Sequence, residues 1–341
     1  MSESQFYKYP SIENTYREEW MDKVKTKGFG NIPYCITEKI HGSNTQIDYN
    51  WQTHEFEYCK RTCTIEEGES CYNVQKCFDN IRELVVDLAS YLETTLDGEL
   101  ESVKVYGEVF GGSYPHSDVA KDSHASRVQK GVFYSPHNEW KAFDIAYTLV
   151  EDEKIHFLCG EDFYLACNAV GIETVPLLKV TNNLQEALEY PNNGESVVYS
   201  HYKLPKLENN IMEGVVIKPW KEDAWIGQSR VIFKNKNEVF AEKSHEKRTN
   251  IQIEVPPLVK QAMEEISAYI TENRVNNVIS HLGEVSEKDI GRIIGMTAKD
   301  ALEDYKKEFG TLNLIEKQEE KMVTKFLQSE VAKLVRKIIL R

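Results

Sequence analysis

The chain carries, at residues 37–44, the stretch Thr37-Glu38-Lys39-Ile40-His41-Gly42-Ser43-Asn44. It follows a short apolar run, Tyr34-Cys35-Ile36, that is typical of the end of a buried strand. Backbone N–H groups of a glycine-containing turn can approach phosphate oxygens. The segment therefore predicts that Lys39 is a nucleophile held against a phosphate, which requires the amine in its uncharged form. Because the Lys-x-x-Gly pattern is short, a solvated lysine at a strand end is the alternative interpretation.

Five further motifs follow Lys39 along the chain. In order, they are Lys60-Arg61-Thr62, Val105-Tyr106-Gly107-Glu108-Val109, Ala142-Phe143-Asp144-Ile145, Glu213-Gly214-Val215-Val216-Ile217-Lys218 and Phe233-Lys234-Asn235-Lys236. With the first segment, this set resembles the covalent nucleotidyltransferases, which include ATP-dependent ligases and messenger-RNA capping enzymes. Glu38-Lys39-Ile40-His41-Gly42 resembles the RNA ligase 2 family in particular, comprising the phage double-strand RNA ligase and the trypanosome RNA-editing ligases. Residues 273–280 are also similar to a segment of that family's helical C-terminal domain.

The spacing of apolar residues predicts an α+β protein. Strand-like runs occur at residues 34–37, 56–61, 103–110, 141–149, 214–218 and 230–234, and a helix is expected over 71–96. Since strands distant in sequence carry the motifs, we expect them to converge in a cleft between antiparallel sheets. The resemblance implies the same arrangement, a nucleotidyltransferase (ATP-grasp-like ligase) domain of antiparallel sheets with flanking helices. Residues 111–140 form a long loop, and such loops are usually functional or mobile.

Beyond residue 257 the sequence predicts only helices, over 258–274, 286–296, 297–309 and about 314–341. Ser286 and Asp289 are spaced as in a capping box, and Gly310 is placed as a helix stop. We therefore assign 1–245 to an adenylyltransferase domain, 246–257 to a linker and 258–341 to a small all-α C-terminal RNA-binding domain. The β-barrel domain usual in DNA ligases and capping enzymes is not expected.

Composition limits the class of protein. The chain has 341 residues, 41% of them hydrophobic, which suits a folded two-domain protein. No long apolar run or signal-like N-terminus is present, so we expect no membrane contact. Seven cysteines without a Cys-x-x-Cys pair indicate reduced thiols rather than a zinc site. We expect a reducing, cytoplasmic-type compartment, with an organelle equally compatible.

The net charge of −14 is unusual for a protein that binds nucleic acid. Residues 230–250, however, carry six Lys or Arg against three Glu, which predicts a strip that faces phosphates; a solvated surface is the ordinary alternative. An acidic protein binds nucleic acid weakly without a specific target. We therefore expect a particular RNA end or nick as the partner.

The resemblance implies a role for each motif residue. The catalytic residues it implies are Lys39, Glu213, Lys234 and Lys236, with Glu213 also positioning Mg²⁺ or Mn²⁺. The residues it implies for ATP and AMP are Glu38, Ile40, Asn44, Arg61, Glu108, Phe143, Val216 and Lys218. Phe143 would stack on adenine and Val216 would cover its other face, although a Phe in a strand is also ordinary core. For RNA the implied residues are Lys60, Arg61 and Asn44.

The implied activity is ATP-dependent RNA ligation. Lys39 would form a covalent lysyl-AMP, AMP would pass to an RNA 5′-phosphate, and an RNA 3′-hydroxyl would then displace AMP. Nicks in duplex RNA are the expected substrate, and the enzyme is expected to be a monomer. A DNA-sealing or capping-type enzyme is the closest alternative, disfavoured by His41 where those enzymes usually carry Asp. A non-catalytic RNA-end-binding module is a second alternative, but binding alone requires no nucleophile.

Two departures from the phage enzyme affect the implied roles. Thr37 stands where that enzyme has an arginine, so any contact made by that arginine does not transfer. The loop at 111–140 is longer than its phage counterpart, which leaves the recognition of RNA ends open.

Overall fold

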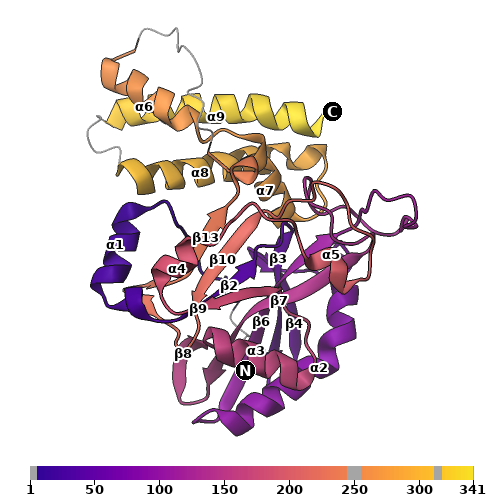
Figure 1. The fold of residues 1–341 in the computed structure, drawn as a ribbon. Coiled ribbons are helices and arrows are strands. Elements are labelled where there is room, and N and C mark those ends of the chain that lie inside the picture. Colours follow the sequence, from indigo (N-terminus) through magenta and orange to yellow (C-terminus); the bar gives the residue numbers. More distant parts are fainter. Residues whose placement is uncertain (1–5, 244–254, 311–316, 341) are drawn as a thin grey trace. The chain divides into compact units, whose positions relative to one another are not determined.

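The computed structural model describes residues 6–243, 255–310 and 317–340 (Figure 1). The chain divides into two compact units, Met1–Asn237 and Glu238–Arg341. Most of the expected linker at 246–257 lies outside the described residues, as do the ends of the last expected helix at 314–316 and 341.

The first unit is built mainly from strands. Its strands are β1 (Glu13–Asn14), β2 (Tyr34–Glu38), β3 (Ser43–Asn50), β4 (Phe56–Lys60), β5 (Cys63–Thr64), β6 (Leu100–Gly111), β7 (Asn138–Leu149), β8 (Asp152–Phe157), β9 (Leu177–Thr181), β10 (Gly214–Pro219), β11 (Trp225–Ile226), β12 (Ser229–Arg230) and β13 (Phe233–Lys236). Its helices are α1 (Glu18–Thr26), η1 (Phe29–Asn31), α2 (Val74–Thr95), α3 (Gly160–Val170), α4 (Leu184–Leu188) and α5 (Val198–His201).

Two main sheets organise this unit. One has the strand order β1-β13-β10-β2-β9 and is antiparallel except for the β1–β13 pair. The other has the order β5-β4-β3-β6-β7-β8 and is antiparallel throughout. Figure 1 shows β2, β10 and β13 side by side, and β11 pairs with β12 in a separate hairpin. The antiparallel sheets with flanking helices confirm the expected fold class.

One face of the six-stranded sheet packs against helices. The apolar stripe of α2, which includes Phe78 and Leu88, is buried with Val103 and Val105 of β6 and with Phe163 of α3 in a single core. Because side chains alternate along a strand, the neighbouring residues of β6 point to the opposite face. That second face is rich in polar side chains and belongs to the site described below.

The second unit is helical among its described residues. Its elements are η2 (Glu238–Phe240), α6 (Pro257–Ser267), α7 (Glu272–Leu282), η3 (Glu287–Asp289), α8 (Ile290–Phe309) and α9 (Lys317–Ile339). These helices share a core that includes Ile266, Val278, Ile293, Leu327 and Val331. Among the described residues, no helix combines the length and the apolar composition needed to cross a membrane.

Two helix boundaries differ from the sequence prediction. The expected helix over 258–274 is interrupted, because the Thr271 hydroxyl accepts a hydrogen bond from the Arg274 N–H and starts α7 as an N-cap. Conversely, the expected break between 296 and 297 is wrong, since Thr297 is buried inside the continuous helix α8. The Ser286 capping box is confirmed, although it caps the short η3 turn that precedes α8.

Candidate active site

The strand register brings the nucleotide motifs together on one face of the five-stranded sheet. Val216 of β10 lies opposite Thr37 of β2 and Lys234 of β13, and directly paired residues point to the same side of a sheet. Lys218, Lys236 and Lys39 follow at spacings of two, so they share this face. The alternate residues, such as Ile36, Ile217 and Phe233, are buried in the core on the opposite face.

Lys39 is held at the end of β2 by both its backbone and its side chain. Its N–H donates a hydrogen bond of 2.9 Å to the carbonyl of Gly214, which continues the pairing with β10 by one residue. Its ammonium donates a hydrogen bond of 2.7 Å to Oε2 of Glu213. Two motifs that are distant in sequence therefore meet at the Lys39 side chain.

Glu213 is the centre of a buried cluster of positive groups. Its side chain is 2% exposed, Nζ of Lys236 lies 3.0 Å from its Oε1, and Nδ1 of His41 lies 3.4 Å from its Oε2. Burial acts to raise the pKa of Glu213, but Lys236, Lys39 and His41 outweigh burial and hold that pKa well below its usual range. Glu213 is therefore a carboxylate at neutral pH and fixes the positions of both lysines.

The second sheet contributes Glu108 to the same turn. Oε1 of Glu108 accepts a hydrogen bond of 3.1 Å from the N–H of Gly42. A Cβ atom at residue 42 would lie 2.2 Å from the carbonyl oxygen of Val109, so only glycine allows this approach. Burial raises the pKa of Glu108 to about 7, while the charge of Lys39 acts to lower it and that of Glu213 to raise it. The charge of Arg61 also acts to lower this pKa.

A second buried charge cluster surrounds Asp144. Its carboxylate accepts hydrogen bonds from Lys218 at 2.9 Å, from Arg230 at 2.6 Å and from Tyr9 at 2.8 Å. Burial acts to raise the pKa of Asp144, but Arg230 and Lys218 lower it overall. The sequence motif contained Asp144 without assigning it a role, and it gave no signal for Tyr9. Arg230, which begins the strip expected to face phosphates, is instead buried against Asp144. Asp144, the residue directly after Phe143, thus holds the Lys218 side chain in position through an ion pair.

Phe143 lies at an irregularity of β7. Asp144 pairs with Tyr106 and Ala142 pairs with Gly107, which leaves Phe143 as an extra residue between them. Its half-buried ring packs edge-on against Tyr9 with centroids 5.0 Å apart. The bulge therefore directs a partly exposed aromatic ring out of the regular alternation of the strand.

Several other predicted residues are buried in contacts of their own. The Glu38 side chain points away from Lys39 and accepts a hydrogen bond of 2.8 Å from the N–H of Val197. Ile40 and Asn44 are 3% and 9% exposed, and Asn44 pairs with Glu108 across the strands. Lys60 is 4% exposed and forms an ion pair with Glu69. The structure therefore does not bring the Glu38 or Lys60 side chain to the Lys39 amine.

The long loop between β6 and β7 contacts the turn that follows Lys39, which the sequence did not predict. The Tyr134 hydroxyl accepts a hydrogen bond of 2.8 Å from the N–H of His41. The Gln129 side-chain amide donates a hydrogen bond of 3.4 Å to the carbonyl of Gly42. The sequence of this loop contains no pattern that indicates such a contact.

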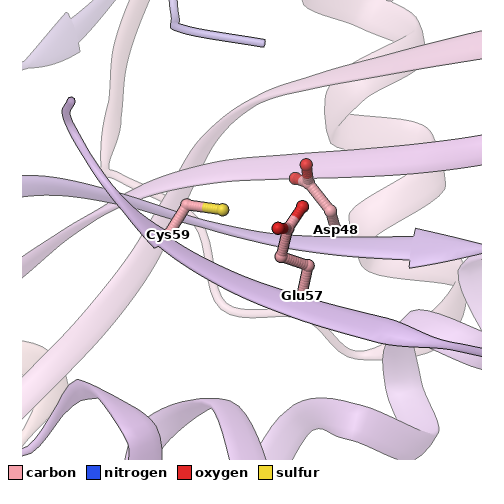
Figure 2. Close-up of side chains that lie close together, drawn as sticks. All are labelled: Asp48, Glu57 and Cys59. Carbon is pink, nitrogen blue, oxygen red and sulfur yellow. The ribbon is translucent and has the colours of Figure 1, made fainter. Parts of the chain in front are cut away.

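Two groups of possible metal ligands occur among the described residues, and neither includes Glu213. One consists of Asp48, Glu57 and Cys59 on β3 and β4 (Figure 2). Lys104 lies 2.8 Å from the Asp48 carboxylate and occupies it as an ion-pair partner. The other group, in the helical unit, is Glu242, Asp300 and Asp304, and it surrounds the guanidinium of Arg274.

Comparison with known proteins defines the family. The model of the RNA ligase family matches residues 32–236, and the model described as T4 RNA ligase 2 C-terminal matches residues 254–333. The chain therefore belongs to the RNA ligase family. The two matches together confirm the predicted membership of the RNA ligase 2 branch and cover both structural units.

Individual relatives are more distant. The chain is 25% identical to the mitochondrial RNA-editing ligase 2 of Trypanosoma brucei brucei, over 89% of this chain and 83% of that protein. It is also 25% identical to the mitochondrial RNA-editing ligase 1 of the same organism, over 87% of this chain and 75% of that protein. A mutant of the Naegleria gruberi RNA ligase with ATP and Mn aligns with a TM-score of 0.47 and 12% identity, covering 70% of this chain and 57% of that chain. The same enzyme with PPi gives a TM-score of 0.45 at 12% identity, over 70% and 58%.

Proposed function

We propose that this protein is an ATP-dependent RNA ligase that works through a covalent Lys39–AMP intermediate. The observation that carries the proposal is the contact of 2.7 Å between Lys39 and the buried Glu213, on a strand face that also holds Lys218, Lys234 and Lys236. Glu213 holds the Lys39 amine, and the ammonium groups of Lys236 and Lys218 are held near it on the same face by Glu213 and Asp144. A structure of the Naegleria gruberi RNA ligase contains ATP and Mn, the same kind of nucleotide and metal ion that we propose for this protein.

In the first step the Lys39 nitrogen attacks the α-phosphorus of ATP. The N–P bond forms, the α–β phosphoanhydride bond breaks, and pyrophosphate leaves with the electron pair of that bond. The ammonium of Lys39 must first release a proton to water, so its pairing with Glu213 represents the state before reaction. Lys234 and Lys236 would neutralise the charge that develops on the phosphate oxygens.

The remaining predicted residues would bind the nucleotide. Phe143 would stack on one face of adenine and Val216 would cover the other. Glu108 would bind a ribose hydroxyl, since its carboxyl group lies beside the turn that carries the nucleophile. Lys218 would contact phosphate from its position on Asp144. Arg61 would act near the ribose or the RNA end.

Glu213 also fits the proposed role in metal binding. Mg²⁺ usually takes one or two carboxylates together with water and phosphate oxygens, and Glu213 supplies a carboxylate whose pKa is held well below its usual range. Bound there, Mg²⁺ or Mn²⁺ would neutralise phosphate charge and orient the leaving group. Glu213 would hold the ion through oxygens that contact Lys39 and Lys236 here, so these ammonium groups would have to give up part of their contact with the carboxylate.

The later steps act on RNA. AMP passes from Lys39 to the 5′-phosphate of RNA, and the 3′-hydroxyl of an RNA end then displaces AMP and closes the phosphodiester bond. We propose a nick in duplex RNA as the substrate, bound by the helical unit Glu238–Arg341 and sealed by one copy of the chain. The match of residues 254–333 to the C-terminal model of an RNA ligase supports this assignment.

A sealing assay tests the proposed function. Duplex RNA with one nick and a labelled 5′-phosphate is incubated with the protein, ATP and Mg²⁺, beside the matching single strand and nicked duplex DNA. The expected result is a sealed strand and a transient AMP-capped strand, with the nicked RNA used fastest. Equal or faster sealing of nicked DNA would contradict the assignment to RNA. Absence of sealing with retained RNA binding would instead favour the binding module.

A further inference from the structure

Tyr134 lies in the segment between β6 and β7, yet it is one of the most deeply buried tyrosines of the described chain. Its side chain is 1% exposed, and its ring packs edge-on against Phe110 with centroids 5.3 Å apart. Burial raises the pKa of its hydroxyl well above the usual range, so the group stays protonated at neutral pH. The oxygen of a hydroxyl held in this way can accept a hydrogen bond at a fixed position.

The group that uses this acceptor is the backbone of His41. The N–H of His41 donates to the Tyr134 hydroxyl at 2.8 Å, in the turn between β2 and β3 where strand pairing has ended. A partly buried N–H group outside strand pairing needs another acceptor, and in this turn side chains from other segments supply it. Glu108 does the same for the next residue, Gly42.

The held turn sets the position of the reacting groups. His41 lies two residues after Lys39, and its ring nitrogen Nδ1 lies 3.4 Å from the Glu213 oxygen that also contacts Lys39. A shift of the His41 backbone would therefore move the imidazole against Glu213 and alter the aim of the amine. Small displacements of reacting groups lower rates strongly even when binding persists.

We propose that Tyr134 is a positioning residue for the attack of Lys39 on ATP: its hydroxyl fixes the His41 turn and so orients Lys39 and Glu213. The inference rests on the proposed function, because it assigns Tyr134 to the first step of that reaction. It also gives the 111–140 segment a role in the chemistry beyond connecting two strands.

The test compares two Tyr-to-Phe variants of the full chain. Tyr134→Phe removes only the acceptor of the His41 N–H. Tyr202→Phe is the matched control, since the Tyr202 ring packs on the same Phe110 at 6.4 Å but its buried hydroxyl has no hydrogen-bond partner among the described residues. For each variant the rate constant and the KM for ATP are measured in Lys39 adenylylation, along with the melting temperature and the sealing of pre-adenylylated RNA, which bypasses Lys39.

The expected loss for Tyr134→Phe is about tenfold in the rate constant of adenylylation, which corresponds to about 1.4 kcal/mol. We expect its KM for ATP and its sealing of pre-adenylylated RNA to stay within about twofold of the wild type, with Tyr202→Phe unchanged in every measurement. An unchanged adenylylation rate in Tyr134→Phe would overturn the proposal. Equal losses in adenylylation and in sealing of pre-adenylylated RNA, or the same loss in Tyr202→Phe, would overturn it as well, because they indicate a purely structural role. A wild-type chain that forms no adenylate would refute the proposed function itself.

Discussion

The ammonium of Lys39 lies 2.7 Å from the carboxylate of Glu213, although the two residues are 174 positions apart in the chain. The pair forms because β2 and β10 are antiparallel neighbours in the five-stranded sheet: Lys39 directly follows β2, Glu213 directly precedes β10, and these two ends lie at the same edge of the sheet. A buried carboxylate that also contacts Lys236 can be accommodated only with such partners, since an unpaired buried charge is costly. In the proposed reaction, the same contact that stabilises the fold would present the amine to the nucleotide.

Replacing Glu213 by Gln should greatly slow the formation of the lysyl adenylate. The variant keeps the shape of the side chain but leaves Lys39, Lys236 and His41 without their common anion. We expect the rate constant of adenylylation to fall by about 100-fold or more, as for other buried charged groups that position reacting atoms. Single-turnover label transfer from ATP measures this rate.

The control for Glu213→Gln is Glu173→Gln. Glu173 also pairs with a buried lysine, Lys141 at 2.6 Å, but its own side chain is 65% exposed and it belongs to none of the proposed nucleotide contacts. Its replacement should leave adenylylation unchanged. A Glu213→Gln variant with the same rate as Glu173→Gln would show that Glu213 does not position the nucleophile.

The Glu38 carboxyl group should make the protein less stable as the pH rises. A carboxylate paired with a positive group has the opposite effect. Burial raises its pKa to about 7 in the folded chain, although the Ser196 hydroxyl and the Val197 N–H act to lower it. A carboxyl group ionises at about 4.3 in an unfolded chain, so the folded state binds more protons between these values and loses stability as the pH rises. Glu38→Gln removes this titration.

The measurement for Glu38 is urea unfolding of wild type and Glu38→Gln at two pH values. Between about pH 5 and pH 8, the free energy of unfolding of the variant should rise relative to the wild type by about 2 kcal/mol. The comparison uses the change with pH, so a constant cost of burying the amide cancels. A difference that does not vary with pH would contradict the raised pKa.

Phe143→Leu should weaken the use of ATP if the half-buried ring stacks on adenine. Loss of an aromatic stacking partner is expected to cost about 1 kcal/mol or more in apparent ATP affinity. The apparent KM for ATP and the melting temperature are measured together, because Phe143 also packs against Tyr9. An unchanged KM with a lowered melting temperature would identify Phe143 as a core residue only.

The sequence predicted the residue types of the site better than their contacts. The spacing of two between Val216 and Lys218, and between Lys234 and Lys236, indicated a shared strand face, and the register of β10 and β13 confirms this. The spacing within one strand holds no information about which strand lies next to it. The sequence therefore could not predict that Glu213 pairs with Lys39 or that Lys218 pairs with Asp144.

The sequence analysis also missed strand β3 and the break between α6 and α7. Strand β3 contains Asn44, Gln46 and Asp48, which are all buried, so the alternation of apolar and polar residues that marks a half-exposed strand is missing there. The break between α6 and α7 was missed because Ile266, Tyr269 and Ile270 continue the apolar period up to the Thr271 cap.

The helical unit should serve RNA rather than ATP. All the residues that we propose for the nucleotide lie within Met1–Asn237, and Glu238–Arg341 forms a separate compact unit with its own core. A chain ending at Asn237 should form the lysyl adenylate but seal nicked duplex RNA poorly. Circular dichroism of the shortened chain must accompany the assay, and efficient nick sealing by the folded first unit would refute this division.

Transfer of label from α-labelled ATP to the protein, read after denaturing electrophoresis, decides whether Lys39 is the nucleophile. In the presence of Mg²⁺ the wild-type chain should retain label, whereas Lys39→Ala and Lys39→Arg should retain none. Arginine keeps the positive charge beside Glu213 but stays protonated, so it cannot attack phosphorus. Both variants should still seal pre-adenylylated RNA slowly, which shows that they are folded. Label on the Lys39→Arg chain equal to that on the wild type would contradict the assignment of Lys39 and, with it, the proposed mechanism.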